Sequence, residues 1–274
     1  MSRILRIGIV GCGAIGSSLA KTVAREFRGK ALLAGLFDID AGKSKSLAAK
    51  LGKPALVSGG LASLIGRCDL VVEASSAAVS ASIAGQVLVK GKSVIVMSVG
   101  GLLGGRIAAL ERISRRTGGK LLIPSGAISG IDAVKAASCA GIRSATLVTT
   151  KHPRSFEGVE YVRRKGVRLG AIRRPTVLFS GSAEEAVRHF PQNINVAAVL
   201  SLAGIGARRT TVKIIASPLA TRNIHEIMIE SSSGKIVTRT ENTVHPENPK
   251  TSFLAVLSAV ALLKETVGTV KVGT

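Results

Sequence analysis

Residues 7–16 of the chain read IGIVGCGAIG, and three glycines there (Gly11, Gly13 and Gly16) follow a run of apolar residues. Glycine loses more conformational freedom on folding than any other residue, so this spacing indicates a backbone that needs the missing side chains. Two kinds of local structure require such glycines. One is a loop whose backbone approaches a phosphate, and the other is simply a tight turn between a strand and a helix.

The segments on both sides favour the phosphate loop. Residues 4–10 are nearly all apolar and are bounded by glycine, which predicts a buried parallel strand. In residues 14–27 apolar side chains recur at helical spacing, which predicts a helix with one apolar face. A strand, then G-x-G-x-x-G, then a helix is the setting of a dinucleotide-binding turn.

In such a turn each glycine has its own task. Gly11 allows the sharp bend, Gly13 lets the backbone reach the pyrophosphate, and Gly16 lets the helix pack closely on the strand. The first helical residues, Ala14 and Ile15, present free N–H groups at the positive end of the helix dipole. We therefore expect these five residues to bind a nicotinamide dinucleotide.

A carboxylate follows at the distance expected for contact with the adenosine ribose. Asp38 belongs to the second predicted strand, residues 31–40, and lies 22 residues after Gly16, near the roughly 20 of the fingerprint. A helix-capping aspartate would give the same local pattern. The charge of Asp38 favours NAD because it would repel a 2′-phosphate, but Lys43 and Lys45 could offset that repulsion. We expect either NAD or NADP as cofactor.

Strands and helices alternate up to about residue 124. The further strands are expected at 69–76, 93–102 and 120–126, and the further helices at 41–52, 80–91 and 105–117. This rhythm predicts an α/β fold, a Rossmann-type doubly wound parallel sheet, as a dinucleotide-binding domain over residues 1–124. Ser75 and the segment MSVGG (97–101) follow two of the strands, where ligands bind in open sheets, although helix caps would also fit. We expect Ser75 to contact the cofactor.

The second half has a different texture. Residues 125–250 predict a second, α+β domain with a mostly antiparallel or mixed sheet. Its strands are expected at 144–153, 176–182, 211–218 and 223–242, the last with a hairpin turn, and its helices at 183–190 and 193–206. We expect the apolar final helix, residues 251–265, to pack back against the first domain.

The composition limits the classes of partner. The chain has 274 residues, of which 46% are hydrophobic, so a large core is expected. The net charge of +22 invites nucleic acid, but the basic residues are dispersed, and six Phe, one Tyr and no Trp leave little for base stacking. No apolar stretch reaches the roughly 18 residues of a membrane span. We expect a soluble, cytoplasmic protein without a specific nucleic-acid or membrane partner, whose basic surface steers anionic small molecules.

Cysteine and histidine are too scattered for a metal centre, so no metal is expected. Cys12, Cys68 and Cys139 show no ligand spacing and are expected to be buried thiols. Among the four histidines, His225 shares a strand face with apolar side chains, which is typical either of a core residue or of a proton shuttle. The other three are expected in a loop beside a proline (His152) and in solvated turns or helix ends (His189 and His245).

Asn193 and Asn195 open a predicted helix after a proline. They are either helix caps or amide groups that bind the nicotinamide carboxamide or a substrate oxygen.

Longer motifs carry a resemblance that periodicity does not give. The chain resembles the L-aspartate dehydrogenases of the NAD-biosynthesis type. The matching stretches, in family order, are GCGAIG (11–16), VVEAS (71–75), IPSGAISGIDAV (123–134), FPQNINVAA (190–198), ATRNIHEI (220–227) and HPENPKTSFLAVLSAVALL (245–263).

The resemblance implies oxidative deamination of L-aspartate with NAD or NADP, through iminoaspartate to oxaloacetate and ammonia, or a supply of iminoaspartate for NAD biosynthesis. It implies that His225 is catalytic and that Ala127, Asn195 and then Asn193 contact the cofactor. It also implies that the second domain, residues 125–250, supplies catalysis and subunit contacts in a homodimer or larger homo-oligomer. Candidates for binding the substrate carboxylates, by sequence position only, are Lys151, Asn223, Lys250 and Thr251.

Two other functions fit the same two-domain pattern. One is a related reductase or dehydrogenase that acts on another small acid, such as a relative of dihydrodipicolinate reductase or homoserine dehydrogenase, because fold alone does not fix the substrate. The other is a regulator that senses NAD without turnover and has a basic binding face.

Overall fold

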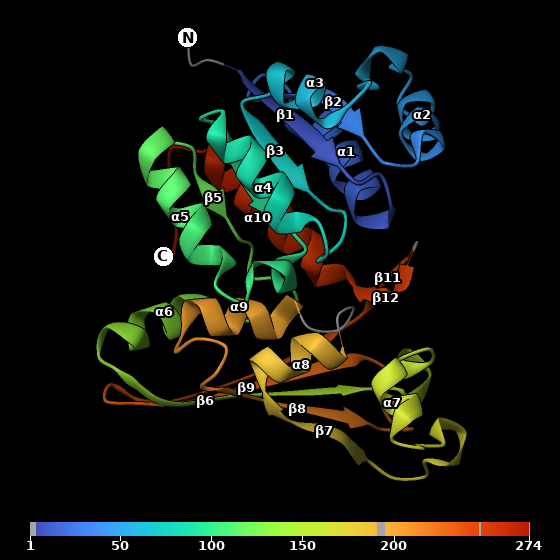
Figure 1. Ribbon diagram of the computed structural model, residues 1–274, viewed down its shortest axis with the longest axis vertical. Coiled ribbons are helices and arrows are strands. Elements are labelled where there is room, and N and C mark those ends of the chain that lie inside the picture. The colour runs from blue at the N-terminus through green and yellow to red at the C-terminus, as the bar shows by residue number, and fades with distance from the viewer. Residues whose placement is uncertain (1–3, 191–194, 247, 274) are drawn as a thin grey trace. The chain divides into compact units, whose positions relative to one another are not determined.

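The computed structural model describes residues 4–190, 195–246 and 248–273 (Figure 1). Contacts within the chain divide it into two compact units. The first unit comprises Met1–Pro124 and Val256–Lys271, and the second comprises Ser125–Ala255 and Val272–Thr274.

The first unit is built on a five-stranded sheet in the order β2-β1-β3-β4-β5, in which every neighbouring pair is parallel. Its elements are β1 (Leu5–Val10), α1 (Ala14–Glu26), β2 (Ala31–Phe37), α2 (Ala41–Lys50), η1 (Pro54–Leu56), α3 (Leu61–Arg67), β3 (Leu70–Glu73), α4 (Ser80–Val89), β4 (Ser93–Val96), η2 (Val99–Leu102), α5 (Arg106–Thr117), β5 (Leu121–Leu122) and most of α10 (Phe253–Val267). The prediction of a Rossmann-type α/β sheet is confirmed.

Alternation along β1 explains how helices cover both faces of this sheet. Ile7 and Ile9 are fully buried in a core that includes α1 and the buried side of α10. Between them, Gly8 faces the other way, where an added Cβ would meet Cys68 and Leu64 at α3. Since both faces of β1 are covered, the strand carries no polar side chain from Ile7 to Val10, as is typical of parallel strands.

The second unit contains a five-stranded mixed sheet in the order β10-β9-β6-β8-β7, where only β6 and β8 run parallel. Its elements are α6 (Ile131–Cys139), β6 (Ile142–Lys151), η3 (Pro153–Phe156), α7 (Glu160–Arg164), η4 (Leu169–Ala171), β7 (Thr176–Ser182), α8 (Ala183–His189), α9 (Asn195–Ala203), β8 (Thr210–Ala216), β9 (Asn223–Ser231), β10 (Gly234–Asn242), β11 (Val244–His245) and β12 (Asn248–Ser252). The predicted mixed sheet is confirmed.

Local chemistry accounts for two of these elements. Ser182 and Glu185 form a reciprocal capping box that starts α8. The strands β9 and β10 form the expected hairpin, in which Ser231 pairs with Gly234 across a two-residue turn.

Helices cover only one face of the second sheet in the part of the chain that the structure describes. Helices α6, α8 and α9 lie on that face (Figure 1). Along β9 every second residue from Asn223 to Ser231 is buried beneath them, while the intervening side chains are half-buried or exposed. The uncovered face carries exposed apolar side chains: Val177, Met228 and Val237.

Three expectations need correction. His245 is not solvated but only 3% exposed, because the short pair β11–β12 folds it against the ring of Phe253. Cys12 and Cys68 are buried as expected, but Cys139 at the end of α6 is exposed. Helices α3, α6 and α7 were not expected from the sequence. None of the helices in the described ranges is long and apolar enough to cross a membrane.

Candidate active site

The glycine turn lies between β1 and α1 at the carboxyl edge of the first sheet. Gly11 has a φ of 90°, in the left-handed region that favours glycine. Added Cβ atoms at Gly11 and Gly16 would collide with the carbonyl oxygens of Ala74 and Gly11, respectively. At Gly13 an added Cβ would meet nothing within 4 Å, and no side chain caps the first turn of α1. The turn is therefore tightly packed beneath and open above, as a phosphate-binding backbone requires.

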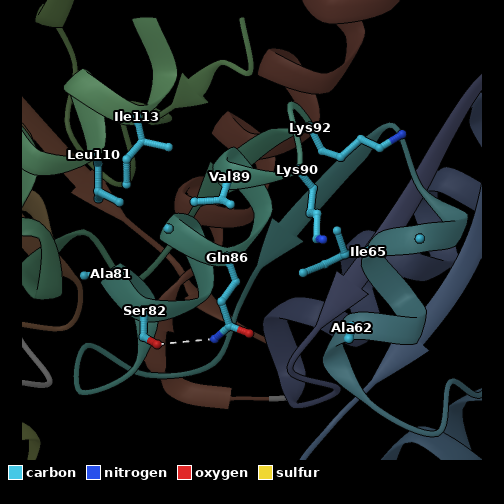
Figure 2. A pocket seen from close by; sticks show the side chains of 12 residues that line it. Ala62, Ile65, Ala81, Ser82, Gln86, Val89, Lys90, Lys92, Leu110 and Ile113 are labelled. Atoms are coloured by element: carbon cyan, nitrogen blue, oxygen red, sulfur yellow. Dashed lines mark hydrogen bonds between the residues drawn. The ribbon is translucent and has the colours of Figure 1, made fainter. Parts of the chain in front are cut away.

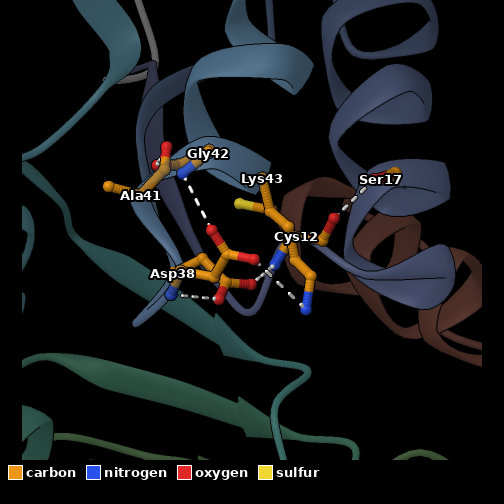
Figure 3. A network of polar contacts seen from close by, with 8 residues as sticks. Cys12, Ser17, Asp38, Ala41, Gly42 and Lys43 are labelled. Atoms are coloured by element: carbon orange, nitrogen blue, oxygen red, sulfur yellow. Dashed lines mark hydrogen bonds and ion pairs between the residues drawn. The ribbon is translucent and has the colours of Figure 1, made fainter.

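Asp38 is hydrogen-bonded to this turn (Figure 3). Its Oδ2 accepts from the N–H of Cys12 at 2.6 Å, and its Oδ1 accepts from the N–H of Asp40 at 2.9 Å. The carboxylate is thus fixed beside the turn, at the end of the neighbouring strand β2. Lys43 faces a different acid, because its Nζ lies 3.9 Å from Oδ2 of Asp40, while Lys45 is exposed on α2.

Ser75 is exposed just beyond β3, the strand on the other side of the glycine turn. Both its N–H and its hydroxyl donate to the carboxylate of Glu73, at 2.8 and 2.7 Å. Ser98, beyond β4, donates to the same carboxylate. The sequence analysis missed Glu73 and Ser98, because a carboxylate next to a strand end is ordinarily solvated.

In the second unit, His225 lies on the covered face of β9 together with Ile227 and Ile229, as the alternation of side chains along the strand predicts. The side chain is 3% exposed, and Nδ1 lies 3.0 Å from Oγ1 of Thr149. Thr149 of β6 pairs directly with His225 across the two strands. Because side chains alternate along a strand, Lys151 lies on the same face as Thr149 and is likewise buried.

Burial controls the ionisation of this pair. Desolvation, with a smaller contribution from the positive charge of Lys151, lowers the pKa of His225 to about 3. Desolvation also lowers the pKa of Lys151 to about 8. At neutral pH the site therefore presents a neutral imidazole beside a lysine that is mostly protonated and loses its proton as the pH rises through about 8.

Amide and hydroxyl groups extend this polar end of the sheet. Asn223, two residues before His225 on the same face, donates from Nδ2 to Oγ of Ser252 at 3.2 Å. Asn242 pairs with Asn223 across β9 and β10 and donates from Nδ2 to the carbonyl of Ala127 at 2.9 Å. The structure thus brings His225 and Asn223 of β9 together with Lys151 of β6 and, through Asn242, with Ala127. These three segments lie far apart in the sequence.

Comparison with known proteins decides the family. The aspartate dehydrogenase C-terminal family matches residues 132–266, and the NAD-binding domain family of homoserine dehydrogenase matches residues 11–124. The L-aspartate dehydrogenase of Methanosarcina barkeri is 42% identical over 99% of this chain and 100% of its own length, and that of Methanosarcina mazei is 44% identical over the same shares. This chain belongs to the L-aspartate dehydrogenase family.

The fold agrees with that family. The crystal structure of aspartate dehydrogenase from Thermotoga maritima has a TM-score of 0.73 at 23% identity, and the match covers 99% of this chain and 100% of that chain. A likeness at this identity shows the fold and leaves the site residues to be argued from their chemistry.

Some candidate residues of this L-aspartate dehydrogenase family member stand apart from the cluster or outside the described residues. Asn195 is the exposed first residue of α9, and Asn193 lies outside the described residues. Thr251 is half-buried in β12, next to Ser252, and the side chain of Lys250 is not described. Thr149, Asn242 and Ser252 were missed by the sequence analysis. Only Thr149 had a local signal, since it precedes Lys151 by two residues in a predicted strand.

The first unit of this L-aspartate dehydrogenase family member also has an apolar hollow of about 820 Å³ between α3, α4 and α5 (Figure 2). Its lining includes Ile65, Val89 and Leu110, with Lys90 and Lys92 as its only cations among the described residues. Neither the glycine turn nor Asp38 or Ser75 lines it. The hollow is therefore separate from the residues that surround the dinucleotide-binding turn.

Proposed function

We propose that this chain oxidises L-aspartate to iminoaspartate with NAD or NADP as hydride acceptor. One observation carries the proposal. A neutral imidazole (His225), fixed by Thr149 and next to the buried Lys151, lies in the second unit of a chain whose first unit has a dinucleotide-binding turn. Family membership supports the same substrate, since the relatives are named for L-aspartate.

The residues of the glycine turn fit the dinucleotide. In the proposal, Gly13 and the amides of Ala14 and Ile15 bind the pyrophosphate, and Asp38 accepts a hydrogen bond from the adenosine ribose. The openness above Gly13 and the fixed position of Asp38 support these roles. Ser75, Ala127 and Asn195 are proposed to contact the nicotinamide half, together with Asn193. The bound dinucleotide supplies a carbon, C4 of the nicotinamide ring, that accepts hydride.

His225 is proposed to be the proton acceptor. The α-ammonium of L-aspartate must lose a proton before Cα can release hydride, and neutral imidazole at hydrogen-bond distance can take it. A base whose pKa is near 3 is weak, but the two carboxylates of bound aspartate bring negative charge and raise that pKa. The imidazole thus becomes more basic when substrate is present.

Lys151 and Asn223 are proposed to hold the substrate carboxylates. Buried ammonium and amide groups on the face of His225 match a dianion in charge and in hydrogen-bond donors, and the dianion offsets the burial of the ammonium. Lys250 and Thr251 directly precede Ser252 in β12 and are proposed as further contacts.

The Cα–H bond breaks with its electron pair going to the dinucleotide, while the nitrogen lone pair forms the C=N bond of iminoaspartate. Water then adds to the imine carbon, and loss of ammonia leaves oxaloacetate. Either this hydrolysis or release of the imine for NAD biosynthesis completes the proposal.

Assembly and location form part of the proposal. A homodimer or larger homo-oligomer is supported by the exposed apolar side chains on the uncovered face of the second sheet, which light scattering would test. Action in the cytoplasm is supported by three cysteines that remain free thiols.

The test is turnover by the purified chain. Formation of reduced dinucleotide is followed by absorbance with L-aspartate and with other small amino and hydroxy acids, using NAD and NADP in turn. Turnover that prefers L-aspartate supports the proposal. Turnover with another acid alone would favour a related dehydrogenase, and dinucleotide binding without turnover would favour a regulator.

A further inference from the structure

A carboxylate in the first unit is buried without a cation. Glu73, the last residue of β3, is 0% exposed, and no lysine or arginine in the described ranges forms an ion pair with it. Burying a carboxylate is costly unless hydrogen bonds replace its water. Four do so here. Oε1 accepts from the N–H and hydroxyl of Ser75 at 2.8 and 2.7 Å and from the hydroxyl of Ser98 at 3.0 Å, and Oε2 accepts from the N–H of Ser98 at 3.1 Å.

These four donors belong to two different loops. Ser75 lies in the loop after β3 and Ser98 in the loop after β4, and both loops sit at the carboxyl edge of the parallel sheet. A second contact supports this arrangement, because the hydroxyl of Ser80, the first residue of α4, donates to the carbonyl of Ser98 at 3.0 Å. Glu73 therefore fixes one loop against the other.

The glycine turn rests on the first of these loops. An added Cβ at Gly11 would collide with the carbonyl of Ala74 and lie 2.9 Å from the nitrogen of Ser75. The backbone that Glu73 holds is thus the surface against which the phosphate-binding turn packs.

The strand order decides which half of a dinucleotide these loops face. Strand β2, with Asp38 beyond its end, lies on one side of β1, and β3 and β4 lie on the other. If the pyrophosphate lies over the turn after β1 and the adenosine ribose at Asp38, the nicotinamide half extends over the ends of β3 and β4.

The hydrogen bonds to Glu73 also fix what Ser75 can offer a ligand. A serine hydroxyl has one hydrogen to donate and two lone pairs to accept with. Because the hydroxyl hydrogen and the backbone N–H of Ser75 are both directed at Glu73, the exposed side of this residue presents an acceptor only. Such a group suits a ribose hydroxyl or a carboxamide N–H and repels a phosphate oxygen.

We propose that Glu73 is a positioning residue of the dinucleotide site: it holds the loops after β3 and β4 and orients the Ser75 hydroxyl as an acceptor for the nicotinamide–ribose half. This inference rests on the dinucleotide use proposed above. It assigns Glu73 no contact with the ligand and no part in the chemical step.

The other end of β3 offers a matched control. Asp69 directly precedes the strand and accepts three hydrogen bonds from Arg6, so it too is a carboxylate that ties β3 to its surroundings. It lies at the amino edge of the sheet, away from the glycine turn. Asp69→Asn removes a comparable set of contacts without disturbing the carboxyl edge.

The experiment compares binding of NAD with binding of ADP, which lacks the nicotinamide riboside, by titration calorimetry of the full chain. Glu73→Gln places an amide donor against the N–H and O–H donors of the two serines. It should raise the Kd for NAD by about tenfold or more while leaving the Kd for ADP near that of the wild type. Asp69→Asn should leave both dissociation constants unchanged, even if its melting temperature falls.

The inference would be overturned if Glu73→Gln weakened the binding of NAD and of ADP equally, or weakened neither. Ser75→Ala provides the same test without altering the buried charge. It too should weaken the binding of NAD more than the binding of ADP. A wild-type chain that fails to bind NAD would refute the dinucleotide use itself. Failure of that kind is distinct from a wild type that binds NAD and a Glu73→Gln variant that binds it equally well.

Discussion

Oγ1 of Thr149 lies 3.0 Å from Nδ1 of His225, and these two residues face each other across β6 and β9. A hydrogen bond at one ring nitrogen fixes both the orientation of an imidazole and its tautomer. If Nδ1 donates to Thr149, Nε2 carries a lone pair and is the atom that accepts a proton. The sheet thus sets which nitrogen of His225 does the chemistry.

His225→Asn should lower kcat by about 10²- to 10⁴-fold, the usual contribution of a general base. The Kd for NAD should not change, because the imidazole acts on the substrate. Initial rates and calorimetric titration measure the two quantities. Parallel losses in turnover, dinucleotide affinity and melting temperature would instead identify His225 as a packing residue.

Thr149→Val keeps the shape of the side chain but removes the hydrogen-bonding partner of Nδ1. We expect kcat to fall about fivefold to tenfold, the effect of one lost hydrogen bond. Thr149→Ser keeps the hydroxyl and should restore most of the rate. A serine variant as slow as the valine variant would show that the methyl packing of Thr149, rather than its hydroxyl, supports turnover.

Lys151 should make the binding of dicarboxylates depend on pH. Its pKa is about 8, so its ammonium is charged below pH 8 and loses its charge as the pH rises through that value. The inhibition constant of succinate, which has two carboxylates and no amine, should therefore increase above pH 8. His225 of the free protein should add no inflection near its ordinary pKa, since burial keeps it neutral before succinate binds.

Lys151→Met should weaken the binding of succinate at neutral pH and abolish the increase of its inhibition constant above pH 8. Lys213→Met is the matched control, because Lys213 lies on β8 with its side chain on the exposed face of the same sheet. The role of Lys151 in binding carboxylates would be refuted if the alkaline increase persisted in Lys151→Met.

Asp38→Ser should shift the preference from NAD towards NADP. The substitution removes both the acceptor proposed for the ribose and the charge that repels a 2′-phosphate. The ratio of kcat/KM for the two dinucleotides measures the shift. An unchanged ratio would mean that Asp38 serves only its hydrogen bond to the N–H of Cys12.

Local patterns in the sequence predicted most of the first unit. The apolar strand, the glycine spacing and the following helix depend on neighbouring residues, so β1, the glycine turn and α1 appear where they were expected. Alternation along residues 223–231 likewise predicted the face of β9 on which His225 lies.

Local patterns could not predict contacts between strands that lie far apart in the sequence. The sequence does not reveal that β6 lies beside β9, so the pairing of Thr149 with His225 was not expected. Glu73 was missed because its burial depends on loops that follow two separate strands. The expectation that His245 is solvated was wrong for the same reason, since a two-residue strand and the ring of Phe253 bury its side chain.

The most direct test of the central claim is the initial rate at which the purified wild-type chain forms reduced dinucleotide from L-aspartate, measured beside the His225→Asn variant. The account predicts steady turnover by the wild type and its near-complete loss in the variant, with NAD bound equally well by both. Tight binding of NAD by a wild-type chain that turns over no L-aspartate would contradict it.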